Sequence, residues 1–403
     1  MSNPTVTAAF LDLLDPRFDF DSAEVADARE LHWYARSPLG PVVLRYREAS
    51  ELLRDQRFKL GGEGYMRAHG ITSGPLYDWW TNALVSVDLA DYLRLRGLLN
   101  KAFTPRLVEG LRPFSRANAR RLAAEIPDST VHDFVSVFAD PLPSLVICRL
   151  LGVPSEDYPL FHRWTADIAT AFSRAGLGGE VLTRVEAAIV AMTGYVAGLL
   201  ERRRGDLGDD LLSALIVAQQ AGERISLDEL RSLTLLLVWA GHDATARQIG
   251  RAMVCFAEHP EQWHVLRRYP TQIPQAVEEI CRWSPQTRLT TRYALEDVDY
   301  QDLRIPAGSQ LLVCVTSANR DRRAFAGADQ FDVTAERKVH QLVFGGGVYR
   351  CLGAALARVE MTEALAALTQ RFGHPEIAGP IVWRPPMSLI HGPDELPLRF
   401  TAV

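Results

Sequence analysis

A cysteine set among glycines is the feature of this sequence with the clearest chemical potential. Residues 344–353 are FGGGVYRCLG, and an Ala- and Leu-rich segment that begins at Ala354 predicts a helix directly afterwards. Glycines let a backbone approach a flat or bulky group closely. A thiolate just before a helix is favoured by the positive helix end, and it is a good ligand for a transition metal or for heme iron.

Two other interpretations of the same loop stay open at this point. A structural turn that holds a buried free cysteine would need no ligand. A phosphate-binding loop fits less well, because the GxGxxG pattern over 345–350 fails at Arg350 and neither Lys-Ser/Thr nor a βαβ context follows. The loop alone therefore favours metal or heme ligation without establishing it.

The elements around this loop are predicted to be mostly helical. Ser226 and Glu229 form a capping-box pattern, and 227–258 follows without proline, which predicts a helix about 48 Å long. Its centre is apolar on nearly all faces, so it should be buried. Further helices are predicted over 93–103 and 209–221, strands over 41–46, 310–317 and 396–400, and a long ordered coil over 325–347.

Composition limits the class of protein. The chain has 403 residues, with 44 basic and 49 acidic side chains, so binding to nucleic acid is not expected. Its 47% hydrophobic and 23% charged residues are typical of a folded protein. Five scattered cysteines without a CxxC pair indicate a reducing compartment. No signal-like or spanning segment is evident, so we expect one cytoplasmic domain over 1–403, with no membrane partner.

Several ordered motifs together resemble the cytochrome P-450 family of heme-thiolate monooxygenases, in its soluble bacterial type. The loop at 344–353 is similar to the family pattern FGxGx(H/R)xCxG at all but one position. Glu279 to Arg282 resembles the ExxR helix, about 70 residues before the cysteine, and Ala240 to Asp243 resembles the oxygen-binding kink of the family's long helix. Segments 208–214 and 391–397 also match bacterial members.

The resemblance implies a mainly α fold with small β-sheets, and heme b (iron protoporphyrin IX) between the long central helix and the cysteine loop. Cys351 would be the axial ligand of the iron. Arg96 and Arg292 would pair with the heme propionates, and Glu279 and Arg282 would form a buried structural ion pair. The residues expected to contact the heme are Tyr92, Arg96, Ala240, Gly241, Arg292, Phe344, Gly345, Tyr349, Arg350, Cys351 and Gly353.

One departure from the family pattern concerns catalysis. The family commonly has an acid followed by a threonine whose alcohol helps to deliver protons during oxygen activation, and here Asp243 is followed by Ala244. The hydroxyl comes at Thr245, which points to a different helix face and could equally bond back to its own helix. A substrate hydroxyl, an ordered water or Asp243 must then help. His242 is expected to pack rather than to relay protons.

Other departures concern the heme carboxylates. Tyr349 and Tyr92 stand where the family usually has cationic or imidazole side chains, and a tyrosine brings a hydroxyl but no charge. More of the propionate charge is therefore left to Arg96 and Arg292. A family arginine is missing at the expected place, and Arg337 is a displaced candidate for its role.

The expected substrate pocket is taken from the family's pocket-lining segments. Aromatic side chains between 65 and 80 could stack on a planar substrate, although core or lid packing is the favoured interpretation for each. The triplet 202–204 of arginines is expected to be a solvated helix end. The residues predicted to line the pocket are Trp80, Val87, Leu236, Leu289, Thr290 and Ile390.

The implied activity is a monooxygenase that activates O2 with electrons from a separate ferredoxin and ferredoxin reductase. The substrate would be an intermediate of secondary metabolism. It would be either a free small molecule, with an aromatic one as an option, or a group tethered to an acyl- or peptidyl-carrier protein. A heme-thiolate gas sensor or heme-binding protein without turnover is the alternative from another class. Asp243 and the wide apolar helix centre argue against it.

Overall fold

The computed structural model describes residues 8–68, 70–172, 178–222 and 225–401. These residues form two compact units. The helical unit comprises Gly62–Pro274, Leu352–Trp383 and Gly392–Val403, and the sheet unit comprises Met1–Gly61, Gln275–Cys351 and Arg384–His391. Most regular structure is helical and the sheets are small, as the sequence predicts.

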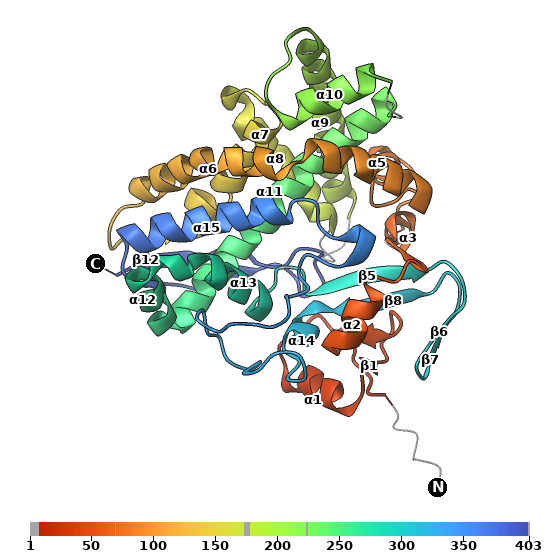
Figure 1. The fold of residues 1–403 in the computed structure, drawn as a ribbon, viewed down its shortest axis with the longest axis vertical. Helices are drawn as coiled ribbons and strands as arrows, with labels where there is room; N and C mark the ends of the chain where they lie inside the picture. Colours follow the sequence, from red (N-terminus) through yellow and green to blue (C-terminus); the bar gives the residue numbers. More distant parts are fainter. Residues whose placement is uncertain (1–7, 69, 173–177, 223–224, 402–403) are drawn as a thin grey trace. The chain divides into compact units, whose positions relative to one another are not determined.

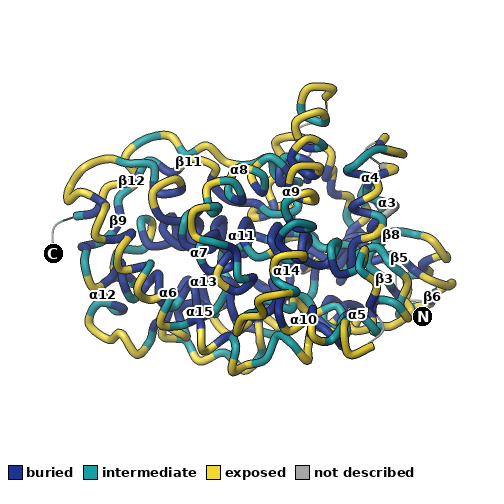
Figure 2. Tube along the Cα trace, turned by 90° about the horizontal axis from the view of Figure 1, so that it is seen from above, coloured by how far each residue is buried: buried dark blue, intermediate teal, exposed yellow. Residues whose placement is uncertain are grey.

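The helical unit is built around one long helix, α11 (Leu227–Glu258), which is buried along most of its length (Figure 2). In Figure 1, α6 and α15 lie side by side along one flank of this unit. The strands of this unit form a three-stranded sheet in the order β4-β12-β9 and the two-stranded pair β10-β11. The helices and strands of the unit are α3 Gly62–Ala68, α4 Pro75–Thr81, α5 Leu89–Ala102, α6 Pro105–Glu125, β4 His132–Asp133, η1 Val135–Ala139, α7 Pro141–Leu150, η2 Ser155–Asp157, α8 Tyr158–Ala169, η3 Thr170–Phe172, α9 Gly179–Gly205, α10 Leu211–Gln220, α12 Pro260–Arg268, η4 Pro270–Gln272, α15 Ala354–Arg371, β9 Pro375–Ile377, β10 Val382–Trp383, β11 Pro393–Glu395 and β12 Pro397–Phe400.

The prediction for α11 is confirmed at both ends. The Ser226 hydroxyl accepts a hydrogen bond from the Glu229 amide at 3.1 Å, and the Glu229 carboxylate accepts one from the Ser226 amide at 2.7 Å. This capping box satisfies amides that the first helical turn leaves without partners. The helix ends at Glu258, and Pro260 opens the next helix at a position where its missing N–H costs nothing.

Helix α9 is long and apolar enough to cross a membrane by length and composition, the one such helix among the described residues. From the sequence we predict no spanning segment, so this helix differs from the prediction by that test. The buried residues of α9, from Val185 to Leu200, recur at three- and four-residue spacing. That stripe is typical of a helix that packs one face against a protein core.

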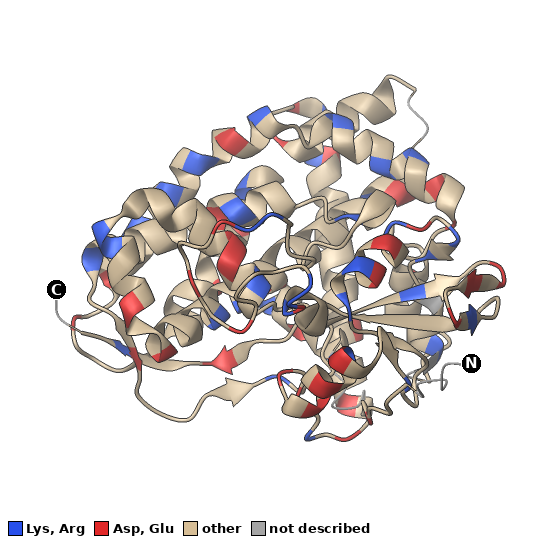
Figure 3. Cartoon of the chain, turned by 60° about the horizontal axis from the view of Figure 1, so that its bottom comes forward, with Lys and Arg blue, Asp and Glu red and all other residues tan. Residues whose placement is uncertain are grey.

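Charges are interspersed along the helices rather than gathered by sign (Figure 3). The arginines at the end of α9 are solvated in part: Arg202 is exposed, as predicted, and Arg203 and Arg204 are half-buried. The Arg203 guanidinium donates to the Gly152 carbonyl, and that of Arg202 lies 5.7 Å from the centre of the Tyr195 ring. Arg203 is therefore held by the chain at Gly152, whereas Arg202 stays exposed.

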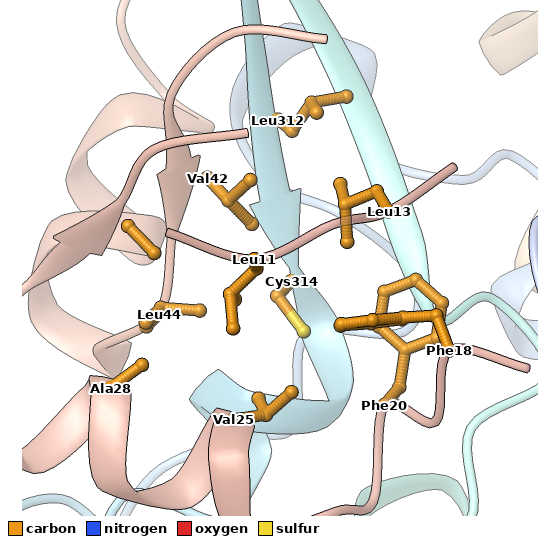
Figure 4. Packing of buried hydrophobic residues seen from close by; sticks show 11 residues of the cluster. Leu11, Leu13, Phe18, Phe20, Val25, Ala28, Val42, Leu44, Leu312 and Cys314 are labelled. Carbon is orange, nitrogen blue, oxygen red and sulfur yellow. The ribbon is translucent and has the colours of Figure 1, made fainter. Parts of the chain in front are cut away.

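The sheet unit contains a five-stranded sheet in the order β1-β2-β8-β5-β3, in which only the β2–β8 pair is parallel. Against this sheet, the N-terminal segment contributes Leu11, Leu13, Phe18 and Phe20 to a hydrophobic core that also contains Cys314 (Figure 4). Burial raises the pKa of the Cys314 thiol to about 12, so this sulfur is a packing group. The elements of the unit are α1 Ala23–Leu31, β1 Tyr34–Ala35, β2 Val42–Val43, α2 Tyr46–Leu52, β3 Phe58–Lys59, α13 Ile273–Trp283 from Gln275 on, β5 Leu289–Ala294, β6 Val298–Tyr300, β7 Leu303–Ile305, β8 Gln310–Cys314, α14 Val315–Asn319 and η5 Gly347–Tyr349.

Two predicted strands are shorter than expected. The segment 41–46 pairs only at Val42–Val43, because α2 begins at Tyr46. The run 310–317 leaves the sheet after Cys314 and turns into α14. A fully buried apolar run has no alternation, so its periodicity does not separate strand from helix. The long coil is confirmed up to the short helix at Gly347.

Candidate active site

The cysteine loop places its thiol at the surface of the sheet unit. The Cys351 amide donates to the Phe344 carbonyl at 2.8 Å and closes the loop. Cys351 is exposed, whereas Cys148, Cys255, Cys281 and Cys314 are all buried. The structure therefore contradicts the alternative of a buried structural cysteine at this position.

Glycine is required at the centre of this loop for two reasons. Gly347 has a φ of +62°, a region that side chains disfavour. A Cβ at Gly347 would also lie 2.8 Å from the Arg54 Cα, at the end of α2. Gly345 adopts a φ of +68°. The loop can therefore pack against the chain after α2 only with glycine at 347. Phe344 is buried beneath the loop, while Arg350 is exposed and Gly353, in the helical unit, is half-buried.

A buried arginine lies beside the loop. Arg292, on β5, is 2% exposed. Its guanidinium carbon lies 5.4 Å from the centre of the Tyr349 ring, and its Nη1 donates to the Thr291 carbonyl at 3.0 Å. Strand residues alternate between faces, so Thr290 shares the face of Arg292, whereas Leu289 lies on the other face and packs against the N-terminal core. The structure thus brings Arg292 and Tyr349 together and separates Leu289 from them.

Behind the loop, Glu279 and Arg282 on α13 form a buried ion pair that Arg337 joins. Arg282 Nη2 lies 2.7 Å from Glu279 Oε1, and both side chains are 1% exposed. Arg337 adds contacts of 2.8 and 3.2 Å to the same carboxylate, as its proposed role as a displaced arginine requires. The amide of Asp332 donates to it as well.

In the helical unit, α11 is mostly buried, but one stripe near its middle is open. Ala240 is exposed, and Leu237, Gly241 and Ala244 are half-buried. Their three- and four-residue spacing puts them on one face. Packing also favours glycine at position 241, because a Cβ there would lie 2.5 Å from Ile147 Cδ1 of α7. Thr245 is buried on another face, and its hydroxyl makes no hydrogen bond with any described residue.

Asp243 belongs to a charged group that the sequence did not indicate. Arg247 Nε donates to Asp243 Oδ1 at 3.3 Å, and Arg247 Nη2 donates to both oxygens of Asp140 at 2.9 and 3.2 Å. His162 Nε2 lies 3.6 Å from Asp140 Oδ2. The i, i+4 spacing of Asp243 and Arg247 was a usable sequence signal. Asp140 follows η1 and His162 lies on α8, so no local spacing in the sequence relates either residue to Asp243.

Burial and charge act in opposite directions on this group. Burial alone raises the pKa of Asp140, but the hydrogen bond from His162 and the charge of Arg247 outweigh it and hold that pKa below its ordinary value. Burial lowers the pKa of His242, whose nitrogens contact the Thr165 hydroxyl and the Asp140 carbonyl at 3.1 and 3.2 Å. His242 is thus a neutral packing residue, as expected.

The predicted propionate helix is α5. The Asp88 carboxylate caps it by accepting from the Asp91 amide at 2.9 Å, and Val87 lies half-buried just before it. Tyr92 is buried and Arg96 is half-buried one turn later, on the same face. Arg96 Nε also donates to Asn100 at 3.2 Å.

The aromatic residues form a cluster within the helical unit. Trp80 packs 4.5 Å from Phe172 and 6.0 Å from Trp239, measured between ring centres, and its indole N–H donates to the Gly62 carbonyl. This supports core packing. A cavity of about 550 Å³ lies among α4, α9 and α11, lined by Trp79 and Leu235 but not by Trp80 or Leu236. Ile390, in the sheet unit, is half-buried, and its carbonyl accepts from Arg384 at 3.4 Å.

The residues of the sheet unit fit a heme. An exposed thiol is a suitable ligand for its iron. The buried Arg292 is a planar cation that suits a carboxylate, and it lies against Tyr349 of the same loop.

Comparison with known proteins gives a consistent answer. The family model described as Cytochrome P450 matches residues 272–380. The chain is 44% identical over 396 residues to the luteothin monooxygenase of Streptomyces thioluteus, which covers 98% of this chain and 96% of that one. It is 40% identical to the 6-deoxyerythronolide B hydroxylase of Saccharopolyspora erythraea, over 77% and 76% of the two chains.

Solved structures agree with these relatives. One is P450BioI in complex with an acyl carrier protein ligated to hexadec-9Z-enoic acid. It matches with a TM-score of 0.84 and 30% identity, over 93% of this chain and 97% of that one.

Proposed function

The chain belongs to the cytochrome P450 family, and from that premise we propose that Cys351 is the thiolate ligand of a heme b at which a secondary-metabolite intermediate is oxidised. The family implies a heme cofactor, O2 and an organic substrate, and the relatives named above are a monooxygenase and a hydroxylase. The observation that carries the proposal is the exposed Cys351 in a glycine loop packed beside the buried Arg292. That 1–403 act as one catalytic domain is part of the proposal, supported by a relative that covers 98% of the chain.

Each proposed site residue has one task. When bound, the heme supplies the activation of O2. Arg292 and Arg96 hold carboxylates of that group, and the hydroxyls of Tyr349 and Tyr92 can donate hydrogen bonds to them without adding charge. Asp243 would relay the protons that oxygen activation consumes. Since Ala244 has no hydroxyl, no side chain at that position can order a water for Asp243.

For the substrate, we propose a free small molecule with an aromatic or other planar part. Support comes from the 44% identity to an enzyme named for luteothin and from the half-buried Leu237 and small residues on the open stripe of α11. A carrier-tethered acyl group is the second candidate, favoured by the likeness to P450BioI in its carrier complex. Electrons would come from a ferredoxin and its reductase in the cytoplasm.

Optical titration of the purified heme protein tests this proposal. Luteothin, free aromatic acids and the same acids loaded on a carrier protein would each be added, and the low-to-high-spin shift would be followed. A shift with free molecules supports the proposal, and a shift only with loaded carrier supports the second candidate. Cys351→Ser should lose the thiolate signature of the reduced CO complex. Cys314→Ser, a buried cysteine of the same unit, should keep it. An unchanged spectrum in Cys351→Ser would overturn the assignment of the ligand.

A further inference from the structure

The cavity among α4, α9 and α11 is large enough for a ligand of its own. Its volume of about 550 Å³ lies within the range of pockets that hold small organic molecules. Its inner wall is buried and apolar, with Trp79 from α4, Ile189 from α9 and Leu235 from α11. All three helices belong to the helical unit, so the cavity is a feature of that unit alone.

The cavity lies on the side of α11 that faces away from the open stripe. Its lining residues on α11 run from Asp228 to Leu235 at three- and four-residue spacing, so they share one face of the helix. Ala244, in the open stripe, follows Leu235 by nine residues, about two and a half turns, which places the two residues on opposite faces. The body of α11 therefore separates this cavity from the stripe that we assign to substrate oxidation.

The charges around the cavity are predominantly negative. Asp78, from α4, lines it and is exposed, and its carboxylate makes no hydrogen bond or ion pair with any described residue. Asp228 and Arg231, both from α11, also line it and pair with each other at 3.0 Å. Glu186, on α9, adds a carboxylate that lies against Gly74, directly before α4. Among these described groups one arginine stands against three carboxylates, so the cavity favours a cation over an anion.

Trp79 provides the aromatic part of the wall. Its ring centre lies 5.8 Å from that of Trp80 and 6.1 Å from that of Trp239. The Trp80 N–H donates to the Gly62 carbonyl at 2.8 Å, whereas the N–H of Trp79 has no acceptor among the described residues. The Trp79 ring can therefore shift toward a ligand without breaking a hydrogen bond. The face of an indole also attracts organic cations more strongly than other aromatic side chains do.

We propose that this cavity is a second ligand site, which binds an organic cation such as an amine. The apolar or aromatic body of the ligand packs on Trp79 and Leu235, and its positive charge lies beside Asp78. A ligand in this place contacts α4, α9 and α11 at once. The proposal goes beyond the proposed function and does not depend on it, because the residues of the cavity take no part in holding a heme or in relaying protons.

Photolabelling of the purified holoenzyme with a matched pair of benzophenones tests the proposal. One probe, (4-benzoylbenzyl)trimethylammonium, carries a fixed positive charge, and the other, 4-benzoylbenzoate, carries the same photoreactive ketone and a negative charge. On illumination the excited ketone takes a hydrogen atom from a C–H group that it touches, and the two radicals join, which forms a C–C bond and turns the ketone into an alcohol. The cation should label peptides that contain 75–82, 189–193 or 228–235, with an affinity about tenfold higher than that of the anion.

Three variants show whether the label reports this cavity. Asp78→Asn should weaken labelling by the cation about threefold. Asp209→Asn changes an exposed acid of the same unit that does not line the cavity, and it should leave labelling unchanged. Val190→Trp, at a lining residue that is 57% exposed, should abolish labelling of these peptides because the larger side chain fills the entrance.

A competitor separates this cavity from the heme site. Labelling should persist when 4-phenylimidazole, a ligand of heme iron, saturates the heme, as followed by the shift of the Soret band. Labelling of other peptides alone, equal affinity for the anion, an unchanged affinity in Asp78→Asn, or loss of the label with 4-phenylimidazole would overturn the proposal. A missing Soret shift would instead contradict the proposed function, while the labelled peptides would still decide whether the cavity binds the cation.

Discussion

Two buried arginine–carboxylate groups described above differ in how fully the guanidinium is paired. We call the group of Arg282 closed and the group of Arg247 open. In the sheet unit, all five N–H groups of Arg282 donate: two to Glu279 and three to the carbonyls of Asn319, Ala328 and Gln330. In the helical unit, Arg247 contacts three carboxylates, those of Asp140, Asp243 and Asp394, and half-exposed His162 adjoins Asp140.

That difference suggests different uses of the same chemistry. A buried pair with every donor and acceptor satisfied has one favourable arrangement, because each alternative leaves an unpaired charge in a poorly polarisable interior. Arg247 contacts several anions, and one of them, Asp394, is 46% exposed, so water can replace part of its pairing. The closed group can hold the chain behind the cysteine loop, and the open group can respond to its surroundings.

The largest expected effect is on the closed group. Glu279→Gln removes the charge that Arg282 and Arg337 share, so two guanidinium groups would lose their anion. The free energy of unfolding should fall by about 3–5 kcal/mol, measured by urea denaturation, and little heme should be incorporated during expression.

Its control is an exposed pair with the same chemistry. Arg121 and Glu125 form an i, i+4 pair on α6 with side chains 50% and 59% exposed. Arg121→Gln should change the free energy of unfolding by less than about 0.5 kcal/mol. Equal losses in the two variants would mean that closure gives no special stability.

The sequence allowed the closed group to be predicted and not the open one. Glu279 and Arg282 lie one turn apart on one helix, and the resemblance to a family supplied Arg337. Asp140 and Arg247 are 107 positions apart and meet only because α7 packs against α11. A pair of that kind has no local signature, since it depends on tertiary packing.

The same distinction applies to the fold. Capping chemistry and an unbroken helical period are local, so α11 was predicted from Leu227 to Glu258 as observed. The strand ends at Val43 and Cys314 were not predicted, because the start of the helix that follows each strand depends on how the surrounding chain is buried. Leu289 and Thr290 were grouped as pocket residues, although strand alternation alone places them on opposite faces.

A second substitution in the closed group should have a smaller effect. Arg337→Lys keeps a positive charge near Glu279 but cannot reproduce the two-pronged contact at 2.8 and 3.2 Å. The loss in unfolding free energy should be about 1–3 kcal/mol, as for a hydrogen bond to a charged group. Full retention of stability would show that charge alone, rather than geometry, holds the network together.

Glu360 provides a third type of buried carboxylate, with neither arginine nor histidine. Neither of its oxygens has a hydrogen-bond partner among the described residues, and burial raises its pKa well above the ordinary value. It stays protonated when folded but ionises when unfolded, so stability should fall by up to about 1.4 kcal/mol per pH unit above its unfolded pKa. Glu360→Gln is neutral at every pH, so its stability relative to the wild type should increase between about pH 4 and pH 8. A difference in urea midpoint that is the same at both pH values would contradict this.

The smallest expected effect is at the outer side of the open group. Asp394 lies 3.6 Å from Arg247 Nη1, but its side chain is 46% exposed, against 12% for Asp140. Water and salt screen such a contact, so Asp394→Asn should cost less than about 1 kcal/mol, and the cost should vanish in about 1 M salt. A loss of about 3 kcal/mol or more that persisted in about 1 M salt would instead mean that Asp394, although partly exposed, is an anion that Arg247 depends on as it depends on Asp140.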